Sequence, residues 1–406
     1  VQQFDNFFVS RIAASKHLAV EQQRIARLPA LDFFPGNLLQ IDPPGISARI
    51  AGNFRPVLEV GRCKPGRSAA VKFKAGPAGG GAVGNDGHNG PHPLDLERIN
   101  FEDAAVLDLF RRGDTAGIFQ FESGGMRRLL KKMKPTKLED LIAANALFRP
   151  GPMDLIESFC MRKNGEEAVP KVHDTVDRFT EETYGIMVYQ EQVMQIVHAL
   201  GDIPLRDAYT LIKAIGKKRH RVINANRPRF IDGAVEKGLD KAFADDLFDL
   251  ILKFAGYGFN KSHSTGYSII AFQTAYLKTY FPVQYMAAVL TFESGAKKTE
   301  DWAPYIGDCR RTVFPDHSTV SKHIGFEVGS PDINQSDALF SVVFNEEEER
   351  SNLGGHIRFG LGAVKGAGNG AVAAIVEDRD GGKPYSSIFD FCSSCLYDAV
   401  VVLADI

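Results

Sequence analysis

A group of polar side chains precedes an aromatic, helix-like segment in the stretch FAGYGFNKSHSTGYSIIAFQTAYLKTYFP, residues 254–282, and includes Asn260, Lys261 and His263. The N-terminus of a helix offers unpaired backbone amides and the positive end of the helix dipole. An ammonium and an imidazole added at that point would make an anion-binding site. The types and spacing of these residues therefore favour phosphate recognition.

A purely structural interpretation of the same turn is also open. Gly256 and Gly258 can end the preceding helix, and Ser262 or Ser264 can cap the next one. This interpretation accounts for the turn but gives no role to the ammonium or the imidazole.

A second candidate for phosphate contact is the stretch 211–230, which has no Asp or Glu. Its basic side chains are Lys213, Lys217, Lys218, Arg219, Arg221, Arg227 and Arg229, with His220 among them. Like charges four residues apart on a helix repel, as for Lys213 with Lys217 and Lys217 with Arg221, unless an anion lies against that face. A solvated charged face is the alternative.

Another basic cluster lies earlier in the chain, at spacings that place most of its members on one side of a helix. Its members are Arg127, Arg128, Lys131, Lys132, Lys134 and Lys137. Two basic faces in one helical region favour a nucleic-acid backbone over a small ligand.

The segment ALFRPGP, residues 146–152, holds Arg149 beside two prolines and a glycine. A guanidinium in a rigid setting can bind phosphate oxygens through two hydrogen bonds. A capped helix end, with Arg149 paired to a carboxylate, explains the segment equally well.

Two further motifs indicate neither a metal nor a nucleotide loop. Cys392 and Cys395 form half of a zinc pattern, but no second pair follows. The stretch GLGAVKGAGNG, residues 360–370, lacks the lysine and hydroxyl of a P-loop, and its glycines do not fit a dinucleotide fingerprint. It predicts a tight turn whose exposed amides could hold a duplex backbone.

The composition bounds the class of protein. The chain has 406 residues, 44% of them hydrophobic, and a formal charge of −2, which permits two or three folded domains. Five cysteines fit no secreted disulfide framework, and no apolar run reaches the roughly 18 residues that span a bilayer. We expect a cytoplasmic location, no membrane contact, and, because the sequence starts at Val1, a piece of a longer protein.

Helix signals follow one another after a Gly/Pro-rich tract in residues 64–93. The predicted helices lie within residues 100–113, with Asn100 as cap and Gly113 as stop, and within 136–148, 189–201, 205–218, 240–256 and 264–281. Short strands are predicted within 336–345 and 356–364, and a last helix within 366–379. The fold class predicted is mainly α, with a small β-containing segment toward the C-terminus.

Six ordered blocks carry a resemblance to a known family. They are GIFQFESGGMR (117–127), ALFRPGP (146–152), YGIMVYQEQVMQI (184–196), AIGKK (214–218), the opening stretch (254–278) and PDIN.S (331–336). Together they resemble the catalytic alpha subunit of bacterial DNA polymerase III, a C-family replicative polymerase, over roughly residues 94–391. The resemblance implies a helical, basic fingers domain that receives the incoming deoxynucleoside triphosphate (dNTP) and holds template-primer DNA.

The resemblance also implies which residues bind nucleotide or DNA. Those that match the family pattern are Gln120, Arg149, Tyr189, Gln190, Glu191, Gly216, Lys217, Lys218, Asn260, Lys261 and His263. Many members have two adjacent arginines where this chain has Ile212 and Lys213, so triphosphate contact there rests on Lys213 alone. A lysine cannot reproduce the two-pronged contact of a guanidinium.

The chain departs from the family at the catalytic carboxylates, for which we predict no residue here. Such enzymes resemble other polymerases in using two Mg²⁺ ions held by palm carboxylates. The nearest match to the family's strand with the third aspartate is VKFKA, where Lys74 replaces the acid. We expect truncation and shifts of reading frame at both ends, no metal ligands in this chain, and no activity of the chain alone.

The resulting hypothesis is a fragment of a replicative DNA-directed DNA polymerase, with other replicase subunits such as the sliding clamp as implied partners. The alternative is a DNA-binding remnant or scaffold without a working nucleotide site. The predicted organisation is an unassigned segment 1–93, helical fingers 94–295, a mixed connection 296–353, a Gly-rich turn and helix 354–391, and an unassigned tail 392–406.

Overall fold

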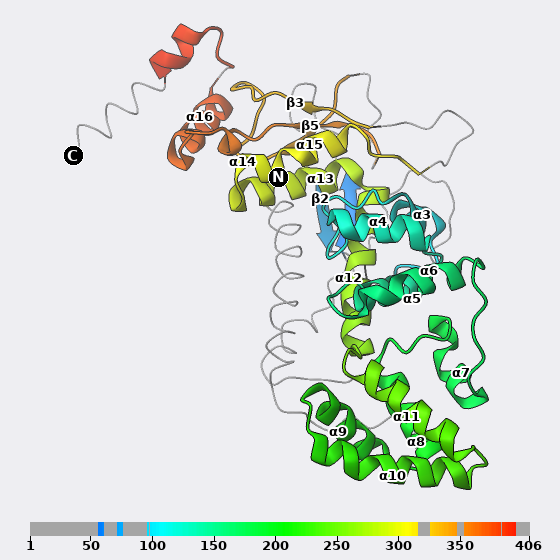
Figure 1. Cartoon of the computed structure of the whole chain (residues 1–406). Coiled ribbons are helices and arrows are strands. Elements are labelled where there is room, and N and C mark those ends of the chain that lie inside the picture. Colours follow the sequence, from blue (N-terminus) through cyan, green and yellow to red (C-terminus); the bar gives the residue numbers. More distant parts are fainter. Residues whose placement is uncertain are drawn as a thin grey trace. The chain divides into compact units, whose positions relative to one another are not determined.

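The protein is described from a computed structural model (Figure 1). It describes residue 96 and residues 98–315, 325–346, 353–382 and 384–394, and the backbone of two strands, 56–60 and 71–75. These residues contain fourteen α-helices and two small sheets. The predicted mainly-α fold class is confirmed. Apart from the two strands, Leu96 and Arg98, the expectations for residues 1–98 fall outside the described residues, as do Cys395 and the rest of the tail.

The first two strands include the segment compared above with the family's palm strand. β1 (Pro56–Val60) pairs antiparallel with β2 (Val71–Ala75), with Val57 opposite Lys74. The VKFKA segment is therefore a strand.

The chain divides into two compact units, of which Asn100–Ala275 is one. We call it the helical unit; the remainder, with Tyr276–Ile406, is the terminal unit. The predicted domain boundaries stay a prediction. The helical unit contains α3 (Ala104–Arg112), α4 (Gly124–Met133), α5 (Leu138–Leu147), α6 (Ile156–Lys163), α7 (Asp174–Thr180), α8 (Gln190–Gly201), α9 (Leu205–Gly216), α10 (His220–Glu236), α11 (Lys241–Ala255) and α12 (Lys261–Tyr280) as far as Ala275.

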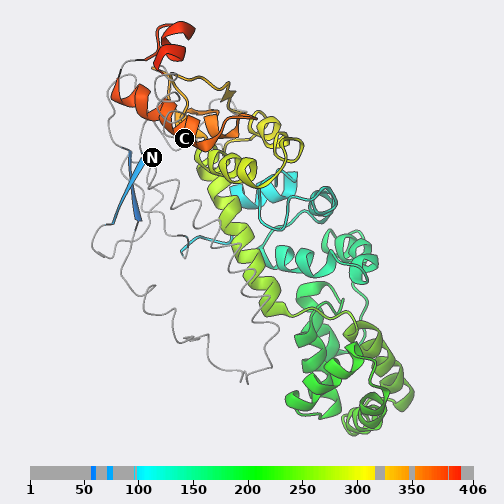
Figure 2. The same ribbon diagram turned by 90° about the vertical axis from the view of Figure 1, so that its left-hand side faces the viewer.

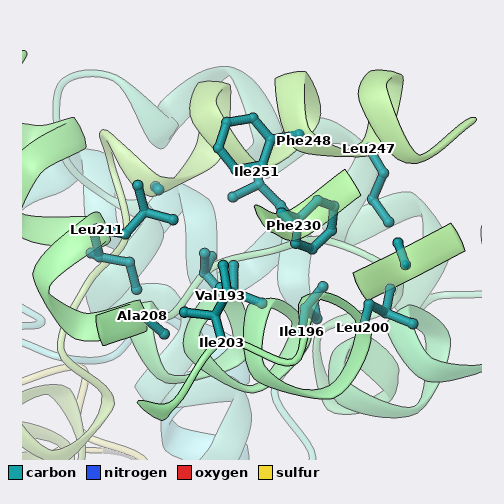
Figure 3. Close-up of a cluster of buried hydrophobic side chains, with 14 of the residues drawn as sticks. Val193, Ile196, Leu200, Ile203, Ala208, Leu211, Phe230, Leu247, Phe248 and Ile251 are labelled. Atoms are coloured by element: carbon teal, nitrogen blue, oxygen red, sulfur yellow. The ribbon is translucent and has the colours of Figure 1, made fainter. Parts of the chain in front are cut away.

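Helices α8, α9, α10 and α11 form a group around one apolar core, green in both views (Figures 1 and 2). Phe230 of α10 lies against Phe248 of α11, with ring centroids 5.4 Å apart, and both side chains are fully buried (Figure 3). The backbones of α8 and α10 approach closely at Gly233. A Cβ added there would lie 2.5 Å from the carbonyl oxygen of Gly201. This core holds the ends of α9 and α10 in place.

Two local features differ from the expectations. Asp103, not Asn100, caps α3, because its carboxylate accepts the amides of Ala105 and Val106. Helix α10 continues through Pro228, although a proline interior to a helix removes a hydrogen bond. No helix was predicted over these residues.

The terminal unit has short elements. They are α13 (Pro282–Ala296), α14 (Thr299–Trp302), α15 (Pro304–Cys309), β3 (Val328–Gly329), β4 (Ser341–Val343), β5 (His356–Arg358), a 3-10 turn Leu361–Ala363 and α16 (Asn369–Gly381). The sheet order is β3-β5-β4, with β4 antiparallel to β5, which confirms the two predicted strands. Among the described residues, no helix has the length and apolar character needed to cross a membrane.

Candidate nucleotide and DNA interface

The first turn of α12 is occupied by side chains of this chain. The Asn260 side-chain oxygen accepts the amide of His263 at 2.8 Å, so Asn260 is the cap and the expected caps Ser262 and Ser264 are wrong. The Glu191 carboxylate accepts the Lys261 amide at 3.0 Å and the Asn260 side-chain NH₂ at 3.1 Å. Amides that the sequence offered to a phosphate are therefore already bonded to an amide oxygen and a carboxylate.

The Lys261 ammonium is also neutralised within the protein. Its Nζ lies 2.7 Å from each carboxylate oxygen of Glu182. The same Nζ is 5.4 Å from the centre of the Tyr189 ring, within reach of a cation–π contact. An anion that binds Lys261 must therefore compete with Glu182.

His263 lies among aromatic rings. Its ring centroid is 4.4 Å from that of Tyr267 and 5.6 Å from that of Phe259. Burial lowers the pKa of His263 from its ordinary value, because desolvation disfavours the charged imidazolium. At neutral pH this imidazole can offer hydrogen bonds but little positive charge.

Tyr189 and Gln190 fix the turn that precedes α12. Phe259 donates its amide to Val188, and Gln190 donates its amide to Phe259, which makes a parallel bridge between Tyr189 and Phe259. The Gln190 side chain donates to the Gly258 carbonyl at 3.0 Å. Tyr189 is fully buried, and this burial raises the pKa of its hydroxyl well above the ordinary value. These residues position the turn through the backbone.

Arg149 holds the same turn from the end of α5. Its Nε donates to the Ala146 carbonyl at 2.7 Å, a terminal NH₂ donates to the Tyr257 carbonyl at 2.6 Å, and the guanidinium lies 4.3 Å from the centre of the Phe259 ring. Burial lowers its pKa. The carboxylate partner considered from the sequence is not among these contacts. In ALFRPGP, Gly151 has φ of 105° and packs where a Cβ would meet the Tyr257 ring.

A second group of predicted residues lies where α9 ends and α10 begins. We call this group the α9–α10 corner: Lys213, Lys217, Lys218, Arg219, His220 and Arg221. All six residues are exposed, and none forms an ion pair with a carboxylate of the described residues. Lys213 lies over the ring of Tyr209 at 4.2 Å.

The chain changes direction within this corner. Lys217 caps α9, Lys218 has a left-handed φ of 53°, and α10 starts at His220. Lys217 and Arg221 therefore belong to different elements, so the expected repulsion between them within one helix was wrong.

The other two basic residues of 211–230 have acidic partners from neighbouring helices. Arg227 donates to Asp245 at 2.7 Å and to Asp249 at 2.6 Å, both on α11. Arg229 lies 3.5 Å from Asp207 of α9. A stretch without acids in the sequence thus acquires them in the fold.

Comparisons with known proteins identify the family. Residues 85–238 match the family described as the bacterial DNA polymerase III alpha subunit finger domain, and residues 325–400 match a helix-hairpin-helix motif. The chain is 40% identical over 311 residues to the DNA polymerase III subunit alpha of Pasteurella multocida, which covers 75% of this chain and 25% of that protein. It is 41% identical over 303 residues to the Thermus aquaticus subunit (73% and 23%) and 42% over 306 residues to that of Helicobacter pylori strain J99 (74% and 24%).

The chain belongs to the DNA polymerase III alpha subunit family. It spans about a quarter of the length of these relatives. The family predicted from the sequence motifs is confirmed.

Within this alpha-subunit chain, the remaining predicted positions are dispersed. Gln120 is exposed with φ of 64°, beside Phe119, whose amide donates to Thr274 of α12 at 3.4 Å. In the earlier basic cluster, Arg128, Lys131 and Lys134 are exposed, whereas Lys132 pairs with Glu157. The helix predicted for this cluster is α4.

The match to a helix-hairpin-helix motif includes the glycine-rich turn noted in the sequence. Gly366 has φ of 91°, and Gly368 caps α16. Lys365, Gly366 and Gly368 are exposed. PDIN.S has a structural role here, because the Asn334 side chain exchanges two hydrogen bonds with the Tyr385 backbone, of 2.9 and 2.8 Å.

Sequence reasoning missed Glu182. It is the partner of Lys261 and lies 79 residues before it in the chain. No local pattern connects the two positions, because the contact depends on how the turn before Tyr184 meets the start of α12.

Proposed function

We propose that this chain is the part of a replicative DNA polymerase alpha subunit that binds the incoming dNTP and template-primer DNA during template-directed DNA synthesis. The observation that carries the proposal is the α9–α10 corner, where exposed basic residues gather without a described carboxylate partner. Lys217, Lys218 and Arg221 are the primary contacts, and Lys213 contributes from α9.

The physical reason is electrostatic. A cluster of like charges costs free energy in the absence of an anion, and phosphates supply one. Protein cations that bind DNA phosphates release condensed counterions, which increases the affinity for DNA. This increase becomes smaller as the salt concentration rises. The corner therefore suits phosphate binding better than cations that are already paired with carboxylates of the described residues.

The second part of the proposed interface lies at the start of α12 and consists of Lys261, Asn260, Gln190, Tyr189, Glu191 and Arg149. Lys261 offers its ammonium to a triphosphate oxygen on exchange with Glu182. Arg149, Tyr189 and Gln190 keep the turn before α12 in position, and Glu191 with Asn260 fixes its first turn. His263 offers a neutral imidazole, and Gln120 an exposed amide.

The turn at Gly366 is proposed to hold the DNA backbone in the terminal unit. Its glycines are exposed and lie at the start of α16, and backbone amides at such turns bind phosphate. A sliding clamp and a cytoplasmic location remain expectations attached to this proposal.

Among the described residues, no group of three or more His, Cys, Asp or Glu side chains could hold a metal ion. We propose that the chain binds its substrates but does not extend a primer by itself, since Lys74 takes the place of the family's strand aspartate.

The test uses the whole 406-residue chain with fluorescently labelled primer-template DNA. We expect binding that weakens between about 50 and 200 mM salt, because released counterions drive it. Affinity independent of salt would contradict the phosphate contacts. Added dNTP separates the two candidate functions: it should bind at a site lost in Lys213→Ala, whereas a DNA-binding scaffold would bind DNA alone. Primer extension with all four dNTPs and Mg²⁺ would contradict the expected inactivity.

A further inference from the structure

Glu182 is held rigidly at the position where an anion would meet Lys261. It belongs to the 3-10 turn Glu181–Thr183, and the next residue, Tyr184, has a left-handed φ of 55°. Thr183 is buried, and its hydroxyl lies 2.6 Å from the Ile186 carbonyl and accepts the Gln192 side-chain NH₂ at 2.8 Å. The turn therefore fixes the backbone from which the Glu182 side chain extends.

The two carboxylates near the start of α12 have different tasks. Glu191 accepts the backbone amide of Lys261 and the side chain of Asn260. Glu182 instead places both carboxylate oxygens 2.7 Å from the Lys261 ammonium. The Lys261 and Glu182 side chains are 36% and 32% exposed, so water and a ligand can reach the pair.

We propose that Glu182 determines the anion specificity of Lys261. It occupies the ammonium as an internal counter-ion, and only an anion of high charge density displaces it. A triphosphate has several negative charges on adjacent phosphates, whereas a DNA phosphodiester has one. Glu182 thus favours the triphosphate of an incoming nucleotide over the DNA backbone at Lys261. This inference rests on the proposed function in assigning Lys261 to phosphate.

Displacement is energetically feasible. Partly exposed ion pairs contribute little to stability, about 0.2 to 1 kcal/mol in most measurements. Exchange of Glu182 for a triphosphate oxygen retains the charge neutralisation of Lys261 and frees the carboxylate to water. The carboxylate then weakens binding of every anion, and weakens binding of the singly charged one most.

The test measures binding of inorganic tripolyphosphate and of a single-stranded oligonucleotide to the whole chain. We compare Glu182→Gln, which removes the charge, with Glu181→Gln, which removes an exposed charge one residue away and serves as the matched control. Glu182→Gln should tighten tripolyphosphate binding about two- to fivefold and tighten oligonucleotide binding more. Glu181→Gln should change neither the affinity for tripolyphosphate nor the affinity for the oligonucleotide.

Lys261→Met and the double variant Glu182→Gln/Lys261→Met separate the two levels of the argument. We expect Lys261→Met to weaken tripolyphosphate binding and to abolish the effect of Glu182→Gln. If Lys261→Met leaves that binding unchanged in both backgrounds, the assignment of Lys261 in the proposed function is wrong. If Lys261→Met weakens binding but Glu182→Gln fails to tighten it, or weakens it, Lys261 stands and the role given to Glu182 is overturned. Circular dichroism establishes that each variant is folded.

Discussion

The α9–α10 corner and the start of α12 both present cations that the sequence assigns to phosphate, yet their surroundings differ. In the corner, Lys217, Lys218 and Arg221 are exposed and form no ion pair with a described carboxylate. At the start of α12, Lys261 is paired with Glu182, and Glu191 accepts its amide.

The difference follows from the elements that surround each group. The corner lies where one helix ends and another begins, beyond the core of α8 to α11. The start of α12 instead contacts the turn Glu181–Thr183 and the first residue pair of α8, both of which bring an acid. We infer that the corner binds polyanions directly, whereas the α12 site binds by exchange.

The largest effect should come from removing charge in the corner. Lys217→Ala/Lys218→Ala/Arg221→Ala should reduce the slope of log affinity against log salt for duplex DNA by up to about three, since each lost phosphate contact removes about 0.9. Affinity at low salt should fall by about tenfold or more. Salt titration by fluorescence anisotropy measures both.

Two controls sharpen this comparison. Arg227→Gln also removes a positive charge, but one already paired with Asp245 and Asp249, so the slope should stay nearly unchanged. Lys261→Met should likewise leave DNA binding nearly unchanged. Equal losses of DNA affinity in the triple variant, Arg227→Gln and Lys261→Met would contradict the distinction between the two regions.

An intermediate effect should come from the scaffold of the corner. Gly233→Ala places a Cβ 2.5 Å from the Gly201 carbonyl oxygen, so α8 and α10 must separate at a cost of about 1 to 3 kcal/mol in the free energy of unfolding. Gly216→Ala is the control, because nothing lies within 4 Å of the added Cβ and alanine favours the helix by up to about 1 kcal/mol. Urea unfolding should show opposite signs; a Gly233→Ala protein as stable as the parent would contradict the close packing.

The smallest effect concerns pH at the start of α12. Burial lowers the pKa of His263 below its ordinary 6.5, so the unfolded chain binds this proton more readily. The stabilisation is therefore complete above about pH 6.5 and decreases as pH falls through that value toward the folded pKa. Thermal unfolding at pH 8 and pH 5.5 should show that His263→Gln loses less stability between these two pH values than the parent does.

Glu191 acts in the opposite sense and makes the parallel comparison necessary. Burial raises its pKa from 4.5, so its protonated form is favoured in the folded state, and stability falls as pH rises through that range. Both proteins retain Glu191, so the difference between them reports His263. An identical pH dependence of stability in the two proteins would contradict the proposed effect of burial on the pKa of His263.

Much of the fold could be predicted from local signals. Helical periodicity, with stops such as Gly113 and Gly201, located α3, α5, α8, α9 and α11 to within a few residues. Helix α10 was missed because Pro228 interrupts its pattern. The cap of α12 was misassigned because Asn260 and two serines are all good capping residues, and only the backbone path selects among them.

The sequence by itself determined the helices, the clustering of cations and, through ordered motifs, the family. The tertiary structure decided which cations keep their charge available. Glu182 and Glu191 meet Lys261 from 79 and 70 residues away, and Asp245 and Asp249 meet Arg227 from a neighbouring helix. Charge pairing depends on distances of a few ångströms, and those distances arise from helix packing, which periodicity along the chain does not specify.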